Sequence, residues 1–322
     1  MLYDLHVNRF DLPLDGPGNY RVRNGVIYTK SIEISATRQC NLSCRGCSHS
    51  SPIAAEQELD PENAAGDLKM LSRFMKCQTL YVLGGEPLLH SNLTGLLRAV
   101  RASEISERIC IFTNGILLDR VDDETLSLVD EIYLSLYPLS SAVTARIRER
   151  AEEIAHKGIK VQTVEYASFR ESISQEPTAG QAVIKTIYDT CQVAHVWRCL
   201  AVDSGKLYRC PQSMIFAEKT QDYSDALEIR KISNVETVLS FLENNQPIGA
   251  CACCLGSIGA EFQHEQVRAA EWSSKLPQHP EDALDYDYAA KLWKDAHSGR
   301  ARIRRKWKKA KIKLKRIIKS FQ

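Results

Sequence analysis

The chain has 322 residues, of which 44% are hydrophobic and 25% are charged, a composition typical of globular proteins. No run of about eighteen apolar residues occurs and the first residues lack a secretory apolar core, so we expect a cytoplasmic protein without transmembrane helices. The net charge of +2 conceals an asymmetry, because residues 300–319 hold twelve Lys or Arg and no acid, which leaves −10 on residues 1–299.

Strand-like apolar runs alternate with helical patterns from residue 31 onward. We predict strands over residues 31–36, 79–83, 108–112, 132–136 and 159–164, and helices over 61–75, 92–102, 122–129 and 142–157. Asp60 and Pro61 suit a helix start, and Gly158 suits a helix end. This alternation predicts an α/β fold with a parallel sheet and outer helices. Five strands, with a sixth expected further along, are fewer than the eight of a complete barrel.

The pattern changes near residue 166. Residues 167–190 have no clean period, and residues 200–208 predict a hairpin that turns at 203–205. We therefore expect an N-terminal extension (1–30), a core (31–166, or to about 190), a small cysteine-rich module (167–260), a helical segment (261–298) and a basic tail (299–322).

Nine of the eleven cysteines form two groups, Cys40, Cys44 and Cys47, and then Cys191, Cys199, Cys210, Cys251, Cys253 and Cys254. Cys77 and Cys110 stand alone in apolar contexts, and we expect them to be buried. In a reducing compartment, clustered cysteines bind metal or do chemistry. The first group has Cys-x3-Cys-x2-Cys spacing, which suits an iron–sulfur cube with one open iron. A zinc site with His49 as fourth ligand is the alternative.

Three further motifs follow the next strands in order: Gly84-Gly85-Glu86-Pro87, Thr113-Asn114-Gly115, and Ser135 within its strand. Together with Cys40, Cys44 and Cys47, they resemble the radical S-adenosylmethionine (SAM) superfamily. The resemblance implies a partial (β/α)6 barrel, a [4Fe–4S] cluster on the three cysteines, and an external one-electron reductant of the flavodoxin or ferredoxin type. It also implies SAM contacts from Gly84, Gly85, Glu86, Pro87, Asn114 and Ser135. Many members have an aromatic residue before the third cysteine; Gly46 stands here, so we assign no adenine contact.

The second cysteine group resembles the twitch and SPASM modules of the same superfamily. The resemblance implies an auxiliary [4Fe–4S] cluster on Cys199, Cys210, Cys251 and Cys254, with Cys191 as the alternative to Cys199. A structural zinc site on the same thiolates is the other interpretation.

The resemblance implies an enzyme that cleaves SAM to a 5′-deoxyadenosyl radical and takes a hydrogen atom from a substrate. The first hypothesis is an epimerase or alcohol dehydrogenase with a small-molecule or saccharide substrate. It would react at a sugar or aminoglycoside-like carbon. Cys253, between two expected ligands, is then the candidate hydrogen-atom donor. The alternatives are a radical SAM peptide maturase and a non-enzymatic zinc-binding interaction protein.

The basic tail predicts a cationic amphipathic helix with apolar residues on one face: Ile303, Trp307, Ala310, Leu314, Ile317 and Phe321. Such a helix suits the anionic inner face of the membrane. Docking on the acidic body of the same chain and RNA binding are the alternatives, and a nucleic-acid partner is the least favoured.

Overall fold

The computed structural model describes residues 20–297, and nine strands of this part form one sheet in the order β10-β9-β8-β2-β3-β4-β5-β6, with β1 on β2. Their bounds are β1 (Arg21–Arg23), β2 (Val26–Thr37), β3 (Met75–Gly84), β4 (Ser106–Thr113), β5 (Glu131–Leu136), β6 (Lys160–Glu165), β8 (Leu200–Asp203), β9 (Lys206–Tyr208) and β10 (Ala226–Glu228). The strands from β8 through β2 to β6 are parallel to one another, whereas β1, β9 and β10 pair antiparallel. A separate antiparallel pair joins β7 (Ser168–Arg170) and β11 (Glu261–Gln263).

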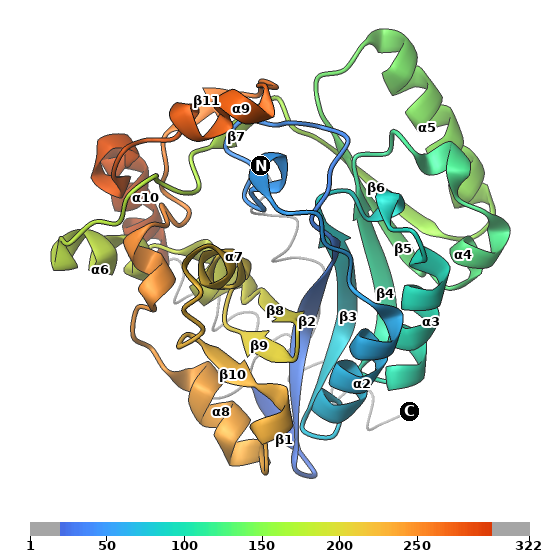
Figure 1. The fold of residues 1–322 in the computed structure, drawn as a ribbon, viewed down its shortest axis with the longest axis horizontal. Coiled ribbons are helices and arrows are strands. Elements are labelled where there is room, and N and C mark those ends of the chain that lie inside the picture. Colours follow the sequence, from blue (N-terminus) through green and yellow to red (C-terminus); the bar gives the residue numbers. More distant parts are fainter. Residues whose placement is uncertain (1–19, 298–322) are drawn as a thin grey trace, which may run out of the picture.

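Helices follow the parallel strands along the chain and lie on the outer side of the sheet (Figure 1). These are α2 (Pro61–Leu71), α3 (Leu93–Ser103), α4 (Asp123–Ser127) and α5 (Ser141–His156). Further helices are α6 (Gln181–Asp189), α7 (Pro211–Thr220), α8 (Val235–Glu243), α9 (Ala269–Trp272) and α10 (Tyr286–His297). Short turns of helix include η1 (Ser51–Ile53), η2 (Pro87–Leu89), η4 (Val193–Trp197), η6 (Gly249–Ala252) and η8 (Pro280–Ala283). In the described part of the chain, no helix is long and apolar enough to span a bilayer.

The two faces of the sheet carry different residues because successive side chains of a strand point to opposite sides. On β2, Ile32 and Ile34 belong to the main hydrophobic core, together with Leu68 of α2. Ser31, Glu33 and Ser35 alternate with them and are also buried. The inner face of β2 is therefore buried and polar.

The predicted α/β fold with a parallel sheet is confirmed, and a partial barrel is consistent with it. All five predicted strands are present, and Cys77 and Cys110 are buried as expected. The sixth parallel strand, β8, lies beside β2 and not beyond β6. Helix α2 ends at Leu71, earlier than predicted, because Met75 already begins β3.

The cysteine-rich region continues the sheet of the core. The predicted hairpin is formed by β8 and β9, which turn through Ser204 and Gly205 with positive φ angles of 45° and 74°. The region without a clean sequence period contains β7 and α6. Because β8 pairs with β2, residues on the hairpin come close to the loop that follows β2. The predicted amphipathic tail helix lies outside the described residues.

Candidate active site

The loop with Cys40, Cys44 and Cys47 leaves the C-terminal end of β2. The Leu42 N–H donates to Cys40 Sγ (3.4 Å), and the Cys47 N–H donates to the Cys44 carbonyl (3.3 Å). Gly46 has a φ of +62°, and a Cβ there would lie 2.8 Å from Phe262 Cζ. An aromatic side chain at position 46 would therefore clash, which gives the physical reason for glycine at this position.

The Gly84–Gly85 pair fixes the end of β3 against the base of this loop. A Cβ on Gly84 would lie 2.3 Å from the Thr37 carbonyl oxygen, and one on Gly85 would lie 2.0 Å from the Gln39 carbonyl oxygen. The Gly85 N–H donates to Thr37 O (2.8 Å), and the Glu86 N–H donates to Gln39 O (2.7 Å). Only residues without a Cβ permit this approach of two backbone segments.

Glu86 is 1% exposed, and its carboxylate accepts three hydrogen bonds. The donors are the Thr113 hydroxyl (2.7 Å), the Asn114 N–H (2.8 Å) and the Leu88 N–H (3.1 Å). Burial raises the pKa of Glu86 to about 7, although these hydrogen bonds oppose the shift. Glu86 therefore joins the ends of β3 and β4. Pro87 begins η2 behind it and does not line the cavity described next.

A cavity of about 320 Å³ brings together the three loop cysteines and every predicted SAM-contacting residue except Pro87, namely Gly84, Gly85, Glu86, Asn114 and Ser135. The Asn114 amide donates to Asn41 Oδ1 (2.7 Å), and its Nδ2 lies 3.9 Å from Cys40 Sγ. The motifs spaced along the sequence thus form one site at the carboxyl ends of the strands.

An aromatic wall of this cavity was not predicted from the sequence. Tyr137, Tyr166 and Phe169 line it. Behind them, the His264 ring is stacked on Tyr137 with ring centres 5.1 Å apart and meets Phe169 edge-on at 4.9 Å. Tyr137 could have been found, because it follows Ser135 by two residues, the period of one strand face. No local sequence signal identifies His264.

The segment after β11 closes onto the cysteine loop from the C-terminal part of the chain, at the upper end of the parallel strands in Figure 1. The Val267 N–H donates to Ser43 O (2.8 Å), and the Arg45 N–H donates to Glu265 O (3.0 Å). The fully buried Trp272 donates its indole N–H to the Cys44 carbonyl (2.9 Å). Residues at least 220 positions apart in the sequence thus contact each other at the cysteine loop.

A second cavity, of about 900 Å³, adjoins the first, and Ser48 and His49 line both. Cys253 and Cys254 also line the larger cavity. Burial and the nearby Arg38 charge lower the pKa of His49 to about 4.

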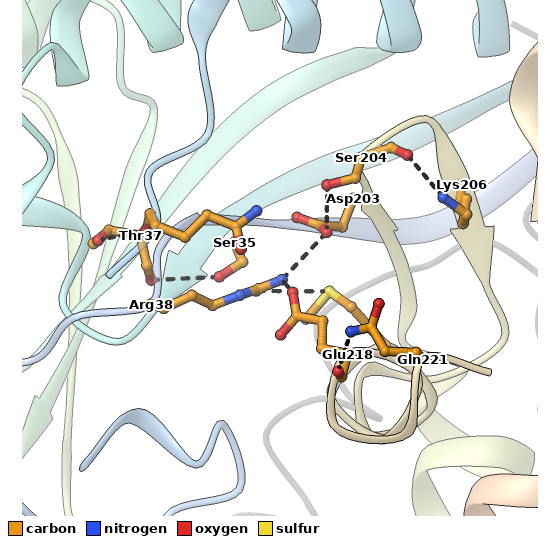
Figure 2. A network of polar contacts seen from close by, with 10 residues as sticks. Ser35, Thr37, Arg38, Asp203, Ser204, Lys206, Glu218 and Gln221 are labelled. Atoms are coloured by element: carbon orange, nitrogen blue, oxygen red, sulfur yellow. Dashed lines mark hydrogen bonds and ion pairs between the residues drawn. The ribbon is translucent and has the colours of Figure 1, made fainter. Parts of the chain in front are cut away.

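An ion-pair network in the wall of the larger cavity ties the cysteine loop to the cysteine-rich region. Figure 2 shows the Arg38 side chain pointing between Asp203 of β8 and Glu218 of α7. The Arg38 guanidinium lies 3.2 Å from the Asp203 carboxylate and also pairs with Glu218. Its Nη1 lies 3.8 Å from the thioether sulfur, Sδ, of Met214. The Arg38 and Asp203 side chains are only 7% and 6% exposed.

A third cavity, of about 240 Å³, is lined by four cysteines, Cys191, Cys210, Cys251 and Cys254. They come from the end of α6, the end of β9, and η6 with the turn after it. Burial, followed by the charges of neighbouring cysteines, raises the pKa of Cys210 to about 12. Three of the predicted ligands therefore meet here with Cys191, whereas Cys199 does not line the cavity.

Residues 34–161 match the family model of the radical SAM superfamily. Residues 34–161 form a radical SAM domain. The GTP 3′,8-cyclase of Chlorobaculum tepidum is 32% identical over 127 residues, which are 38% of this chain and 38% of that protein. The GTP 3′,8-cyclase of Parasynechococcus marenigrum is 28% identical over 170 residues, 48% of this chain and 47% of that protein. The chain thus spans less than half the length of these curated relatives.

Among solved structures, native anSMEcpe with bound AdoMet aligns with a TM-score of 0.47 and 12% identity over 86% of this chain and 99% of that chain. BtrN in complex with AdoMet and 2-DOIA aligns with a TM-score of 0.42 and 16% identity over 67% of this chain and 87% of that chain.

The donor chemistry of the radical SAM domain fits an iron–sulfur cluster. Burial raises the pKa of Cys40 to about 11 and that of Cys44 to about 12, and the charge of Cys47 adds to both shifts. In the metal-free protein both groups are therefore protonated thiols at neutral pH, and each would have to lose its proton to bind iron as a thiolate. Within residues 20–297, no three His, Cys, Asp or Glu side chains form a site for a single metal ion. In a [4Fe–4S] cube each thiolate binds a different iron atom, so the ligands surround a volume, as the cysteines of the first and third cavities do.

Proposed function

We propose that the protein is a radical SAM enzyme that acts on a carbon atom of a sugar or aminoglycoside-like substrate, as an epimerase or an alcohol dehydrogenase. The observation that carries this proposal is the pair of adjoining cavities that share Ser48 and His49. In this proposal SAM would occupy the first cavity beside the loop cysteines, and the substrate would occupy the larger cavity next to it. When bound, the cluster and SAM supply a 5′-deoxyadenosyl radical that takes a hydrogen atom from the substrate.

The residues of the first cavity divide into ligands and supports. Cys40, Cys44 and Cys47 would hold three irons and leave the fourth open to SAM. Asn114 and Ser135 offer polar side chains to the amino-acid or ribose part of SAM. Glu86 acts mainly as a support, because its carboxylate already accepts hydrogen bonds that orient Asn114.

The polar wall of the larger cavity supports the substrate class. Asp203 and Glu218 supply carboxylates, and Arg38 supplies a guanidinium. Hydroxyl groups donate to carboxylates, and ammonium groups form charge-assisted hydrogen bonds with them. A substrate with several hydroxyl or amino groups therefore matches this wall.

The third cavity supports an auxiliary [4Fe–4S] cluster on Cys191, Cys210, Cys251 and Cys254. In this proposal Cys191 takes the place of Cys199 as the first ligand. These four cysteines would hold the cluster, which would supply a one-electron acceptor for dehydrogenase chemistry. An external one-electron reductant of the flavodoxin or ferredoxin type supplies the electron that starts each turnover.

Cys253 suits the role of hydrogen-atom donor in an epimerase, because it lines the larger cavity next to Cys254. Its S–H bond would break homolytically, and the hydrogen atom would form a C–H bond on the opposite face of the substrate radical. The resulting thiyl radical would return to the thiol by taking one electron from the external reductant and one proton from solvent. The Cys253→Ala protein should then hold both clusters and still remove the hydrogen atom from the substrate, but it should release no epimer. Full epimer formation by this variant would remove Cys253 from the mechanism.

The proposal is tested by anaerobic reconstitution with iron and sulfide, followed by reduction with dithionite in the presence of SAM. We expect wild-type protein to form 5′-deoxyadenosine and Cys44→Ala to form about a hundredfold less or none, because one iron loses its protein ligand. Ser43→Ala, in the same loop, is the matched control and should behave as wild type. Wild-type levels of 5′-deoxyadenosine from Cys44→Ala, or binding of one zinc and no iron, would overturn the proposal.

Substrate assays separate the subclasses. Sugars and aminoglycosides test the proposed class, a precursor peptide tests the maturase alternative, and GTP is included because the similar curated proteins are named GTP 3′,8-cyclase. Transfer of deuterium from labelled substrate into 5′-deoxyadenosine identifies the substrate that loses the hydrogen atom.

We also propose that residues 300–322 attach the protein to the anionic inner face of the membrane, because twelve basic residues occur there without an acid. Sedimentation with anionic liposomes should fall when residues 300–322 are removed. Equal sedimentation of the full and shortened chains would exclude membrane attachment through this segment.

A further inference from the structure

The His264 ring lies directly against a ligand of the proposed SAM-binding cluster. Its Nε2 is 3.2 Å from Cys44 Sγ. The ring is held between Tyr137, on which it stacks, and Phe169, which meets it edge-on. The His264 N–H donates to the Ala167 carbonyl (2.9 Å), which fixes the backbone of the same residue. The ring is therefore held in place by its packing.

The direction of the hydrogen bond follows from the state of the sulfur. A thiolate bound to iron carries no proton, so Cys44 Sγ can only accept. The proton must then lie on His264 Nε2, and the contact is an N–H···S hydrogen bond. The Val267 N–H and the Trp272 indole N–H donate to the Ser43 and Cys44 carbonyls, and these hydrogen bonds keep this part of the loop beside the ring.

We propose that His264 is a positioning residue that tunes the SAM-binding cluster by donating a hydrogen bond to the Cys44 thiolate. A donor at a ligand sulfur stabilises the extra negative charge of the reduced cluster, and so raises its reduction potential. Loss of the donor makes the cluster harder to reduce, so a given reductant loads fewer molecules with the electron that SAM cleavage needs. This inference rests on the proposed function, because it assumes a cluster on Cys40, Cys44 and Cys47.

The test is an anaerobic redox titration of the reconstituted full-length protein, followed by electron paramagnetic resonance. Only the signal that changes when SAM is added is analysed, so that an auxiliary cluster does not contribute. His264→Phe keeps an aromatic ring but has no donor, whereas His264→Gln keeps an N–H donor. His279→Phe is the matched control, because His279 lies at the start of η8 and does not line the cavity of the loop cysteines.

We expect His264→Phe to shift the midpoint potential of this signal to a more negative value, His264→Gln to restore part of the shift, and His279→Phe to leave it unchanged. Equal iron content in all variants separates tuning from loss of the cluster. If His264→Phe fails to bind iron, the comparison is made between His264→Gln and His264→Leu. Wild-type potential in a variant without the donor overturns the inference. A wild-type protein without any SAM-responsive signal overturns the proposed function as well.

Discussion

The two cysteine sites of this protein are built in different ways. Cys40, Cys44 and Cys47 lie on one short loop that local backbone hydrogen bonds already shape. The second site draws Cys191, Cys210 and the Cys251–Cys254 turn from three separate segments. The comparison teaches that a contiguous site can be recognised from its spacing, whereas a dispersed site depends on how the chain folds around it.

The difference has an energetic side. The first loop is held on both sides, by Gly84–Glu86 and by the segment that ends at Trp272. Metal binding must remove protons from buried thiols at both sites, but at the second site it must also join three separate segments. The second site should therefore depend more on its metal for local order.

The largest expected effect separates Cys191 from Cys199 as a ligand. In a background without Cys40, Cys44 and Cys47, the reconstituted protein should bind about four irons, which then belong to the second site. Adding Cys191→Ala should abolish this iron, and adding Cys199→Ala should leave it, because only Cys191 lines the third cavity. Iron and sulfide analysis measures both, and the opposite result would restore Cys199 as the ligand.

The next effect concerns the link between the two regions. Arg38→Ala leaves the Asp203 carboxylate, only 6% exposed, without its cation, and should lower the free energy of unfolding by about 3–5 kcal/mol. Lys231→Ala, which breaks the exposed pair with Glu228, is the control and should cost about 0–1 kcal/mol. Urea unfolding of the metal-free proteins measures both, and equal losses would mean that the Arg38 network does not hold the regions together.

A smaller effect tests the support of the first site. Gly85→Ala places a Cβ against the Gln39 carbonyl oxygen, so it should destabilise the protein by about 1–3 kcal/mol and lower iron uptake at the first site only. Gly66→Ala, at an open position of α2, should instead stabilise it by about 0.5–1 kcal/mol. Iron analysis and thermal unfolding distinguish the two, and normal iron uptake by Gly85→Ala would contradict the proposed support.

The last prediction concerns the pH dependence of stability that Glu33 causes on β2, the strand that pairs with both β3 of the core and β8 of the cysteine-rich region. Burial raises the pKa of Glu33 on β2 from 4.5 to about 8, and its Oε1 has no hydrogen-bond partner among residues 20–297. Between these pH values the unfolded carboxyl is ionised while the folded one keeps its proton, so rising pH favours unfolding. The wild type should therefore lose about 1.4 kcal/mol of stability per pH unit relative to Glu33→Gln. Urea unfolding from pH 5 to 8 measures the difference, and a pH-independent gap would show that Glu33 is ionised in the fold.

The sequence by itself determined the parallel α/β fold and the three loop cysteines with most of the motif residues of the first site, but not its aromatic wall. The resemblance of its motifs to the radical SAM superfamily predicted that Cys40, Gly85, Asn114 and Ser135 belong to one site. The structure gives the physical reason, because the carboxyl ends of successive parallel strands meet at one edge of the sheet. Gly46 was noted only as a departure, because its reason, the nearby Phe262 ring, lies more than 200 residues away.

Only the tertiary structure showed which residues from distant segments contact each other, because the local sequence pattern does not encode these contacts. The choice of Cys191 over Cys199 for the third cavity, the pairing of Arg38 with Asp203 and Glu218, and the contact of His264 with Cys44 all join segments more than 15 residues apart. Periodicity describes which face of a strand or helix a residue occupies, but it carries no information on which distant segment packs against that face. These contacts therefore became visible only once β8 was seen beside β2 and the segment after β11 was seen on the cysteine loop.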